Sequence, residues 1–310
     1  MTQTNTTELF DNPISFPDPE AQERLSKLIG LDDKISNLSK ILGLLINKDG
    51  LKKWAEKYYS NVDDIMNIVL RRPSLVVLAG DVGSGKSELA ETIGDFVARQ
   101  EKIDITLFPL SLSSRGQGRV GEMTQLISSA FKHTIKEAEK LKHSNKVTGG
   151  IILLIDEADA LAQSRESSQM HHEDKAGVNA FIRGIDSITN AKLPVAVIMC
   201  TNRVNALDPA IRRRAAEVLI FDRPDDNKRK DVISSLFSPF EFTDNDIMKL
   251  VEATGPTKDR KFGFTFSDIV QRLTPAIILD AYPTQKIDPN RALEIARSFI
   301  PTKPFIEDSL

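Results

Sequence analysis

The sequence predicts an α/β fold in which helices cover both faces of a five-stranded parallel sheet, and a small all-helical lid domain follows. Five short apolar segments alternate with helix-length stretches between residues 75 and 221, an alternation typical of a mostly parallel, doubly covered sheet. After Pro224 the apolar spacing is that of helices, and no strand of comparable strength is expected. We therefore expect a flexible N-terminal arm over 1–27, a large α/β domain over 28–224 and the lid domain over 225–310.

Each element is predicted from a local pattern. Residues 1–20 contain three prolines and many polar side chains, a composition typical of poorly ordered chain. From Ala21 to Arg72, apolar residues recur at the three- and four-residue spacing of helices. The expected strands are Leu75–Ala79, Ile103–Leu110, Ile151–Ile155, Val195–Cys200 and Val218–Phe221. The expected helices cover 86–100, 119–143, 174–188 and 206–214, and then 226–238, 244–254, 267–281 and 289–300.

Composition narrows the function classes. The net charge of −3 provides no broad electrostatic footprint for nucleic acid, which we therefore do not expect as a partner. The single cysteine, Cys200, excludes an internal disulfide and fits a reducing compartment. No apolar stretch approaches the ~20 residues that cross a bilayer, and the polar N-terminus lacks a signal-peptide pattern. We expect a cytoplasmic protein with no membrane partner.

A complete phosphate-binding loop pattern, G-x-x-x-x-G-K-S, follows the first predicted strand. Its residues are Gly80, Asp81, Val82, Gly83, Ser84, Gly85, Lys86 and Ser87. The glycines let backbone N–H groups turn toward a phosphate, and the following helix N-terminus adds partial positive charge. We expect Lys86 to contact the β- and γ-phosphates of ATP and the Ser87 hydroxyl to coordinate Mg²⁺. The pattern predicts a P-loop nucleoside triphosphatase.

An acidic pair follows the third predicted strand, where Ile151–Ile155 runs directly into Asp156 and Glu157. Ligands of α/β sheets bind at the carboxyl ends of the strands. We expect Asp156 to help hold Mg²⁺ and Glu157 to orient and polarise the attacking water. An apolar strand that ends in Asp-Glu can also be a solvated turn, but the preceding phosphate loop favours the functional interpretation. No complete guanine-binding Asn-Lys-x-Asp motif follows the loop, which argues against a GTPase.

Two further polar positions follow later elements. Asn202 comes directly after the fourth predicted strand, where its side chain can hydrogen-bond the attacking water or the γ-phosphate, or can cap a turn. Downstream, Arg212, Arg213 and Arg214 are adjacent on a predicted helix. They form a solvated basic helix end, or one of them is an arginine finger that completes the ATP site of a neighbouring copy. The pattern alone leaves open which arginine is the main finger.

Together these motifs resemble those of the AAA+ ATPases over about residues 28–300. Ile29 and Gly30 lie where that family has its adenine-contacting segment, and the resemblance implies that both contact the nucleotide. The segment Gly-Phe-Thr-Phe-Ser-Asp, which ends in Ser267 and Asp268, resembles the family's lid-helix signature. We therefore expect Ser267 beside the nucleotide, and no second-sensor arginine there. The resemblance implies ATP and Mg²⁺ as cofactors and a homo-hexameric ring.

Within the AAA+ class the chain is most similar to the pachytene checkpoint type, which remodels HORMA-domain proteins. The stretch 174–186 resembles that family's helix after the acidic pair, and the spacing from Asp208 places the finger at Arg214. Residues 114–123 lie where the family has its first pore loop, so Arg119 and Val120 are expected to contact a protein substrate. His171 and His172 follow as weaker candidates. The family's usual bulky pore aromatic is not found in this stretch, which weakens the case for threading.

The short N-terminal region bears on the branch of the family. About 28 residues precede the core, too few for the separate substrate-recognising domain of the eukaryotic relatives. The single-module form resembles bacterial members, some of which are encoded beside HORMA proteins and nucleotide cyclases in antiphage, cyclic-oligonucleotide signalling. We therefore expect a HORMA-domain protein as the partner.

Two alternatives to a protein remodeller remain. A DNA-linked loader or switch ATPase would share the fold, but the near-neutral charge and the missing second-sensor arginine argue against it. A nucleotide-dependent scaffold would bind ATP without turnover. The presence of Lys86, Asp156, Glu157 and Arg214 argues for a hydrolase instead.

Overall fold

The structure, a computed structural model, describes residues 9–112, 121–143, 146–162, 172–203, 207–258 and 260–305. The chain divides into two compact units. The first consists of Met1–Ser26, Lys34–Ala79 and Ser87–Ile220, and the second of Lys27–Asp33, Gly80–Lys86 and Phe221–Leu310.

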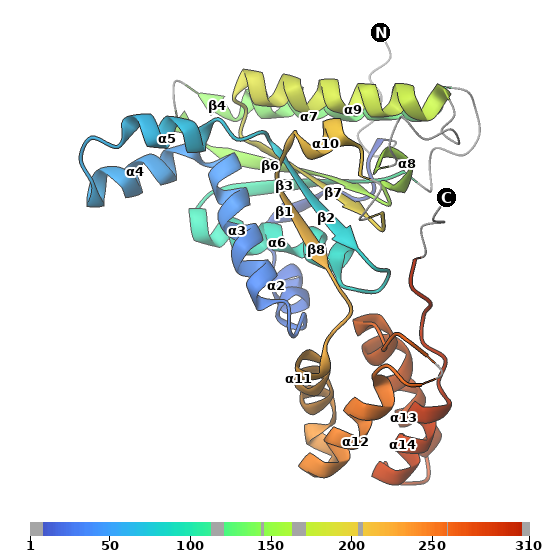
Figure 1. Ribbon diagram of the computed structural model, residues 1–310. Coiled ribbons are helices and arrows are strands. Elements are labelled where there is room, and N and C mark those ends of the chain that lie inside the picture. The colour runs from blue at the N-terminus through green and yellow to red at the C-terminus, as the bar shows by residue number, and fades with distance from the viewer. Residues whose placement is uncertain are drawn as a thin grey trace. The chain divides into compact units, whose positions relative to one another are not determined.

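A six-stranded sheet organises the first unit (Figure 1). Its strands are β1 Ile14–Phe16, β2 Leu75–Gly80, β3 Asp104–Ser111, β6 Gly149–Asp156, β7 Val195–Thr201 and β8 Ala215–Phe221. They lie in the order β1-β3-β6-β7-β2-β8. The pairs β3–β6, β6–β7 and β2–β7 are parallel, and β1 pairs antiparallel with β3. The expected mostly parallel α/β sheet is confirmed, with one more strand than the five predicted.

Helices lie on both faces of this sheet. The helices that precede β8 in the chain are α2 Pro19–Ser26, α3 Asp32–Ile46, α4 Lys48–Tyr58, α5 Asp63–Leu70, α6 Lys86–Glu101, α7 Glu122–Lys140, α8 Asp159–Ala162, α9 His172–Ala191 and α10 Pro209–Arg212. Figure 1 shows α7 and α9 side by side over one face, with α3 and α6 over the other. A small antiparallel hairpin, β4 Lys142–His143 and β5 Lys146–Val147, follows α7.

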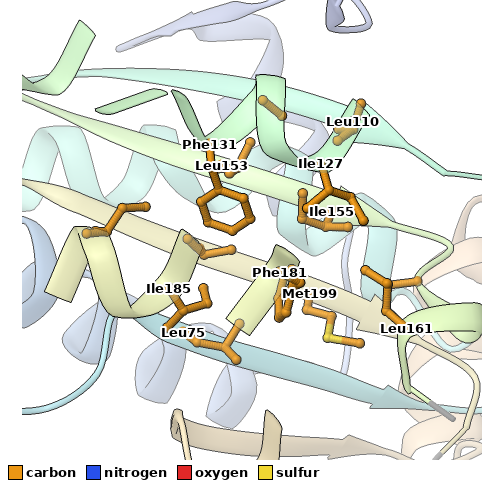
Figure 2. Packing of buried hydrophobic residues seen from close by; sticks show 14 of the residues in the cluster. Leu75, Leu110, Ile127, Phe131, Leu153, Ile155, Leu161, Phe181, Ile185 and Met199 are labelled. Atoms are coloured by element: carbon orange, nitrogen blue, oxygen red, sulfur yellow. The ribbon is translucent and has the colours of Figure 1, made fainter. Parts of the chain in front are cut away.

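The core under α7 and α9 explains why these strands are so apolar. Strands buried on both faces need apolar side chains at every position rather than at alternate ones, and β2 and β7 are buried throughout. Figure 2 shows Phe131 of α7 beside Leu153 and Phe181 of α9 beside Met199. The two rings meet edge to face at 5.7 Å, and such pairs contribute about 0.5–1.5 kcal/mol beyond area burial.

The described residues 9–26 are packed, although they lie in the predicted flexible arm over 1–27. Leu9 and Phe10 are buried in the sheet core, and Phe10 stacks on Phe108 of β3 with the ring centroids 4.8 Å apart. Phe16 of β1 is also buried, against the Gly94 position of α6. Among the described residues, 9–26 therefore belong to the packed unit. The polar and proline-rich composition suggested disorder, but a few apolar side chains in this segment pack against elements that are distant in sequence.

The second unit is helical after β8, as expected. Its elements are α11 Asp226–Phe237, a 3₁₀ turn η1 Ser238–Phe240, α12 Asp244–Thr254, a π-helical segment η2 Asp268–Leu273, α13 Thr274–Ala281 and α14 Pro289–Ser298. Phe237, Phe264 and Leu273 lie in its core. Because Lys27–Asp33 and Gly80–Lys86 also group with this unit, the unit differs from the lid domain expected over 225–310. In the parts of the chain that the structure describes, no helix is long and apolar enough to cross a membrane.

The packing of the N-terminal segment can be tested by removing Phe10. The substitution Phe10→Ala is expected to lower the free energy of unfolding by about 3 kcal/mol, because it leaves a cavity where a buried ring stacked. Urea unfolding followed by circular dichroism measures this. A matched control is Tyr59→Ala, which truncates a 56% exposed ring and should change stability by less than about 0.5 kcal/mol. Equal small effects of both substitutions would contradict the packing described here.

Candidate functional site

The phosphate-loop sequence connects β2 to α6, and its glycines are required by its geometry. Gly80 has φ 157°, and a Cβ there would lie 2.0 Å from the carbonyl oxygen of Phe221. Gly83 has φ 72°, and a Cβ there would lie 2.8 Å from Thr265 Oγ1. Any other residue would be strained and would clash at both positions. The loop leads into the N-terminus of α6, where the first backbone N–H groups of the helix and the helix dipole favour an anion.

Lys86 is folded back onto the loop. Its side chain is buried, and Nζ donates to the carbonyl oxygens of Gly80 at 2.9 Å and Asp81 at 2.7 Å, with Ser84 Oγ at 3.4 Å. The ammonium therefore lies within the loop that is expected to bind the phosphates. Phosphate oxygens carry full charge and form stronger hydrogen bonds with an ammonium than neutral carbonyls do. Lys86 can thus exchange its hydrogen bonds to these carbonyls for hydrogen bonds to a phosphate, and its ammonium keeps hydrogen-bond partners throughout.

The other predicted nucleotide contacts lie in the same unit as the loop. Gly30 has φ 78°, and a Cβ there would lie 3.7 Å from the Phe266 ring. Ile29 packs against the helical core of this unit. The backbone N–H of Ser267 donates to the Gly83 carbonyl at 3.1 Å. The structure gathers Ile29, Gly30, the loop and Ser267 together, and their contacts with a nucleotide remain a prediction.

An ion pair that local sequence patterns do not predict also holds the loop. Arg223 Nε donates to Asp81 Oδ2 at 2.6 Å, and both side chains are largely buried. Arg223 Nη1 also donates to the Gly263 carbonyl at 2.7 Å, and the Phe305 N–H donates to Asp81 Oδ1 at 3.1 Å. Asp81 is thus a structural residue of the loop, whereas Val82 is 42% exposed. The partners are 142 positions apart, so no local motif could reveal the pair.

In the first unit, the predicted magnesium ligands contact each other. Ser87 Oγ donates to Asp156 Oδ1 at 3.2 Å, so a hydroxyl and a carboxylate oxygen face one point at the carboxyl end of β6. Among the described residues, no group of three or more His, Cys, Asp or Glu side chains could hold a metal alone. Magnesium commonly takes one or two protein oxygens and completes its shell with phosphate and water. The Ser87–Asp156 pair fits that pattern.

Glu157 is held in an unusual backbone conformation beside this pair. Its φ is 53°, a left-handed value that costs about 1–3 kcal/mol in a non-glycine residue and persists mainly at functional sites. Its N–H donates to Asp156 Oδ1 at 2.8 Å. Ser111 Oγ, at the end of β3, donates to Glu157 Oε2 at 2.9 Å. Ser111 was not predicted as a site residue, although it directly follows the predicted strand Ile103–Leu110, and ligands of α/β sheets bind at such strand ends.

Asn202 is fixed by a carboxylate that follows the acidic pair. Its backbone N–H donates to Asp159 Oδ1 at 2.6 Å and its side-chain amide donates to Asp159 Oδ2 at 3.0 Å. Thr201 Oγ1 donates to the same carboxylate at 2.7 Å. Because β6 and β7 are adjacent and parallel, Asn202 and Glu157 lie at the same edge of the sheet. Asp159 was not predicted, since it shows its role only through this contact.

Arg214 forms a bidentate ion pair with Asp186 of α9. Nε and Nη2 donate to the two carboxylate oxygens at 2.7 and 3.0 Å, and Nη1 donates to the Ala210 carbonyl at 3.3 Å. The hydrogen bonds from the guanidinium to Asp186 raise the pKa of Arg214 above its ordinary value. Arg212 and Arg213 are more exposed than Arg214. The guanidinium of Arg214 is thus oriented by its own chain, with about one third of the side chain exposed.

Some predicted contacts cannot be placed. The pore-loop residues Arg119 and Val120, together with His171, lie outside the described residues. Helix α9 begins at His172. The interpretation of 114–123 as a substrate-contacting loop stays a prediction.

Comparison with known proteins defines the class. The ATPase family associated with various cellular activities (AAA) matches residues 76–223, which span the loop, the acidic pair and the strand that ends before Asn202. Together with the mostly parallel sheet, this match shows an AAA ATPase domain in the chain.

Longer similarities define the branch. CD-NTase-associated protein 6 of Escherichia coli strain MS 115-1 is 60% identical over 301 residues, which are 97% of this chain and 97% of that protein. A chain in the structure of the E. coli MS115-1 HORMA:CdnC:Trip13 complex has a TM-score of 0.90 at 58% identity, covering 98% of this chain and 100% of that one. A structure of Rhizobiales Trip13 has a TM-score of 0.76 at 52% identity, with 96% and 100% covered. The chain belongs to the CD-NTase-associated protein 6 family of AAA ATPases.

Proposed function

We propose that the chain binds ATP with Mg²⁺ and hydrolyses its terminal phosphoanhydride. The observation that carries the proposal is the 3.2 Å contact between Ser87 and Asp156. Ser87 directly follows Lys86 of the phosphate loop, so the predicted phosphate ligand is adjacent in sequence to one of the two predicted cation ligands. When bound, ATP and Mg²⁺ supply the scissile bond and a cation that neutralises charge on the phosphates.

Residues of the chain have separate roles in the proposed hydrolysis. Lys86 leaves its loop carbonyls for phosphate oxygens and offsets their charge. Glu157, whose carboxylate accepts the Ser111 hydroxyl, orients a water for attack on the γ-phosphorus and takes up its proton. Asn202, held by Asp159, positions that water or the γ-phosphate from the neighbouring strand. Positioning and charge stabilisation supply most of the acceleration in phosphoryl transfer.

We further propose that the site is shared between copies in a homo-hexameric ring. Arg214 of one copy would reach the γ-phosphate held by the next, where an arginine finger contributes about 10³–10⁵-fold in rate. One observation supports Arg214 over its neighbours: its carboxylate partner, Asp186, holds the guanidinium in a defined direction. The side chain is still partly exposed, as contact with a neighbouring copy requires.

The proposed target is a HORMA-domain protein that acts beside a CD-NTase. The support is that the chain covers nearly the whole of CD-NTase-associated protein 6 and of the chain matched in a HORMA:CdnC:Trip13 complex. ATP-driven motion in the ring would remodel or disassemble that partner, with Arg119 and Val120 as its predicted contacts. In this proposal the activity belongs to bacterial antiphage signalling through cyclic oligonucleotides.

Removing the carboxylate base tests the hydrolysis directly. The substitution Glu157→Gln is expected to lower kcat at least about 100-fold, the lower end of a general base's contribution, while ATP binding and assembly persist because the loop is intact. Phosphate release and binding of a fluorescent ATP analogue measure the two properties. The control Glu137→Gln changes a glutamate of α7 that pairs with Lys140 and should leave both unchanged. Undiminished turnover in Glu157→Gln would refute the assigned role.

The partner proposal predicts selective stimulation. ATP turnover by the wild-type chain should rise several-fold with a HORMA-domain protein, here the one from the E. coli MS115-1 complex or its counterpart from this chain's own source. Glu157→Gln should instead trap that protein in a stable ATP-dependent complex, detected by gel filtration. Double-stranded DNA should have little effect, since the net charge is −3. Stimulation by DNA but not by the HORMA protein would favour a DNA-linked switch.

A further inference from the structure

The N-terminal segment reaches the candidate site through an irregular extension of the β1–β3 pairing. Ile14, Ser15 and Phe16 of β1 pair with Leu107, Thr106 and Ile105 of β3. Beyond them, Pro13 and Pro109 have no N–H to donate, so a regular ladder cannot continue to the end of β3. Asp11 takes over the pairing. Its N–H donates to the Pro109 carbonyl at 2.9 Å.

The carboxylate of Asp11 then reaches the last residue of β3. Asp11 Oδ2 accepts the backbone N–H of Ser111 at 3.1 Å, so a side chain here takes the place that a backbone carbonyl would have in a continuous ladder. The position of Asp11 is itself anchored, because the preceding residue, Phe10, is buried and stacked on Phe108.

A row of hydrogen bonds therefore connects the N-terminal segment to Glu157. Asp11 accepts the Ser111 N–H at 3.1 Å, and the Ser111 hydroxyl donates to Glu157 Oε2 at 2.9 Å. A cavity of about 270 Å³ lies beside this row, with Asp11, Ser111 and Asp156 among its lining residues. Close packing does not fill that side of Ser111, so the hydrogen bonds have more influence on its position than they would in a packed core.

We propose that Asp11 is a positioning residue for hydrolysis, which acts through Ser111 on the carboxylate of Glu157. When the Ser111 backbone is fixed, its hydroxyl can donate to the Glu157 carboxylate from only a narrow range of positions. The carboxylate is then better oriented as a base, and a well-oriented base speeds the attack by water. The inference rests on the proposed ATPase function of the same site. It gives the N-terminal segment a part in catalysis, in addition to its part in packing.

The test measures kcat and KM for ATP in the full chain with Asp11→Ala, Ser111→Ala and the double variant. Asp11→Ala should lower kcat about fivefold, the factor of one lost hydrogen bond, with KM unchanged because the phosphate loop is untouched. The double variant should be no slower than Ser111→Ala alone, since both substitutions interrupt one path. Asp11→Asn should recover to within about twofold of wild type, because its amide oxygen can still accept the Ser111 N–H.

The matched control is Asp18→Ala. Asp18 also accepts backbone N–H groups in the N-terminal segment, from Glu20 and Ala21, and its substitution should leave kcat within about twofold. An unchanged kcat in Asp11→Ala would overturn the proposal, as would independent, multiplying losses in the double variant or an equal loss in Asp18→Ala. Failure of the ATPase function itself would look different, since the wild-type chain would then show no turnover that depends on Glu157.

Discussion

The register of β6 between its two parallel neighbours is the constraint on which the rest of the site depends. Asp156 pairs with Ser111 of β3, and Ile155 pairs with Met199 of β7. Side chains alternate between faces along a strand, so a slip of one residue would turn the Asp156 carboxylate away from Ser87. All eight residues of β6 pair with β3, and five of them, Ile151–Ile155, also pair with β7. Because burial of apolar side chains fixes the register of the sheet, it also fixes the position of the Asp156 carboxylate.

The cations of the site are satisfied by the chain itself. Lys86 donates to loop carbonyls, and Arg214 pairs with Asp186. A partly exposed ion pair contributes only about 0–1 kcal/mol, so the Arg214–Asp186 contact can orient the guanidinium without holding it against a stronger anion. A finger contribution of about 10³–10⁵-fold is far larger than the cost of giving up such a contact. A guanidinium that is oriented but weakly held suits the proposed role of Arg214, which is to complete the ATP site of a neighbouring copy.

The elements that could be predicted from the sequence depend on contiguous residues. The phosphate loop, the acidic pair and the main strands are local patterns, and the structure places Ser87 and Asp156 in contact. Ser111, Asp159 and Asp186 were missed because their roles appear only once distant elements meet. Strand β1 was missed for a related reason, since three residues carry no periodicity and its anchor Phe10 is stabilised by Phe108. Motifs of contiguous residues can be predicted from the sequence. The side chains that position the motif residues come from distant elements, so they can be identified only when the topology is known.

In the proposed ring, each copy holds an incomplete ATP site, which a guanidinium from the next copy completes. This arrangement can be tested by mixing two variants, Arg214→Ala and Lys86→Ala, and measuring phosphate release. Arg214→Ala retains the phosphate loop and Lys86→Ala retains the finger, so some interfaces in mixed rings contain both. Each variant alone should be inactive, and the mixture should regain part of the wild-type turnover. Full activity of Arg214→Ala alone, or no recovery in rings proven to be mixed, would contradict this arrangement.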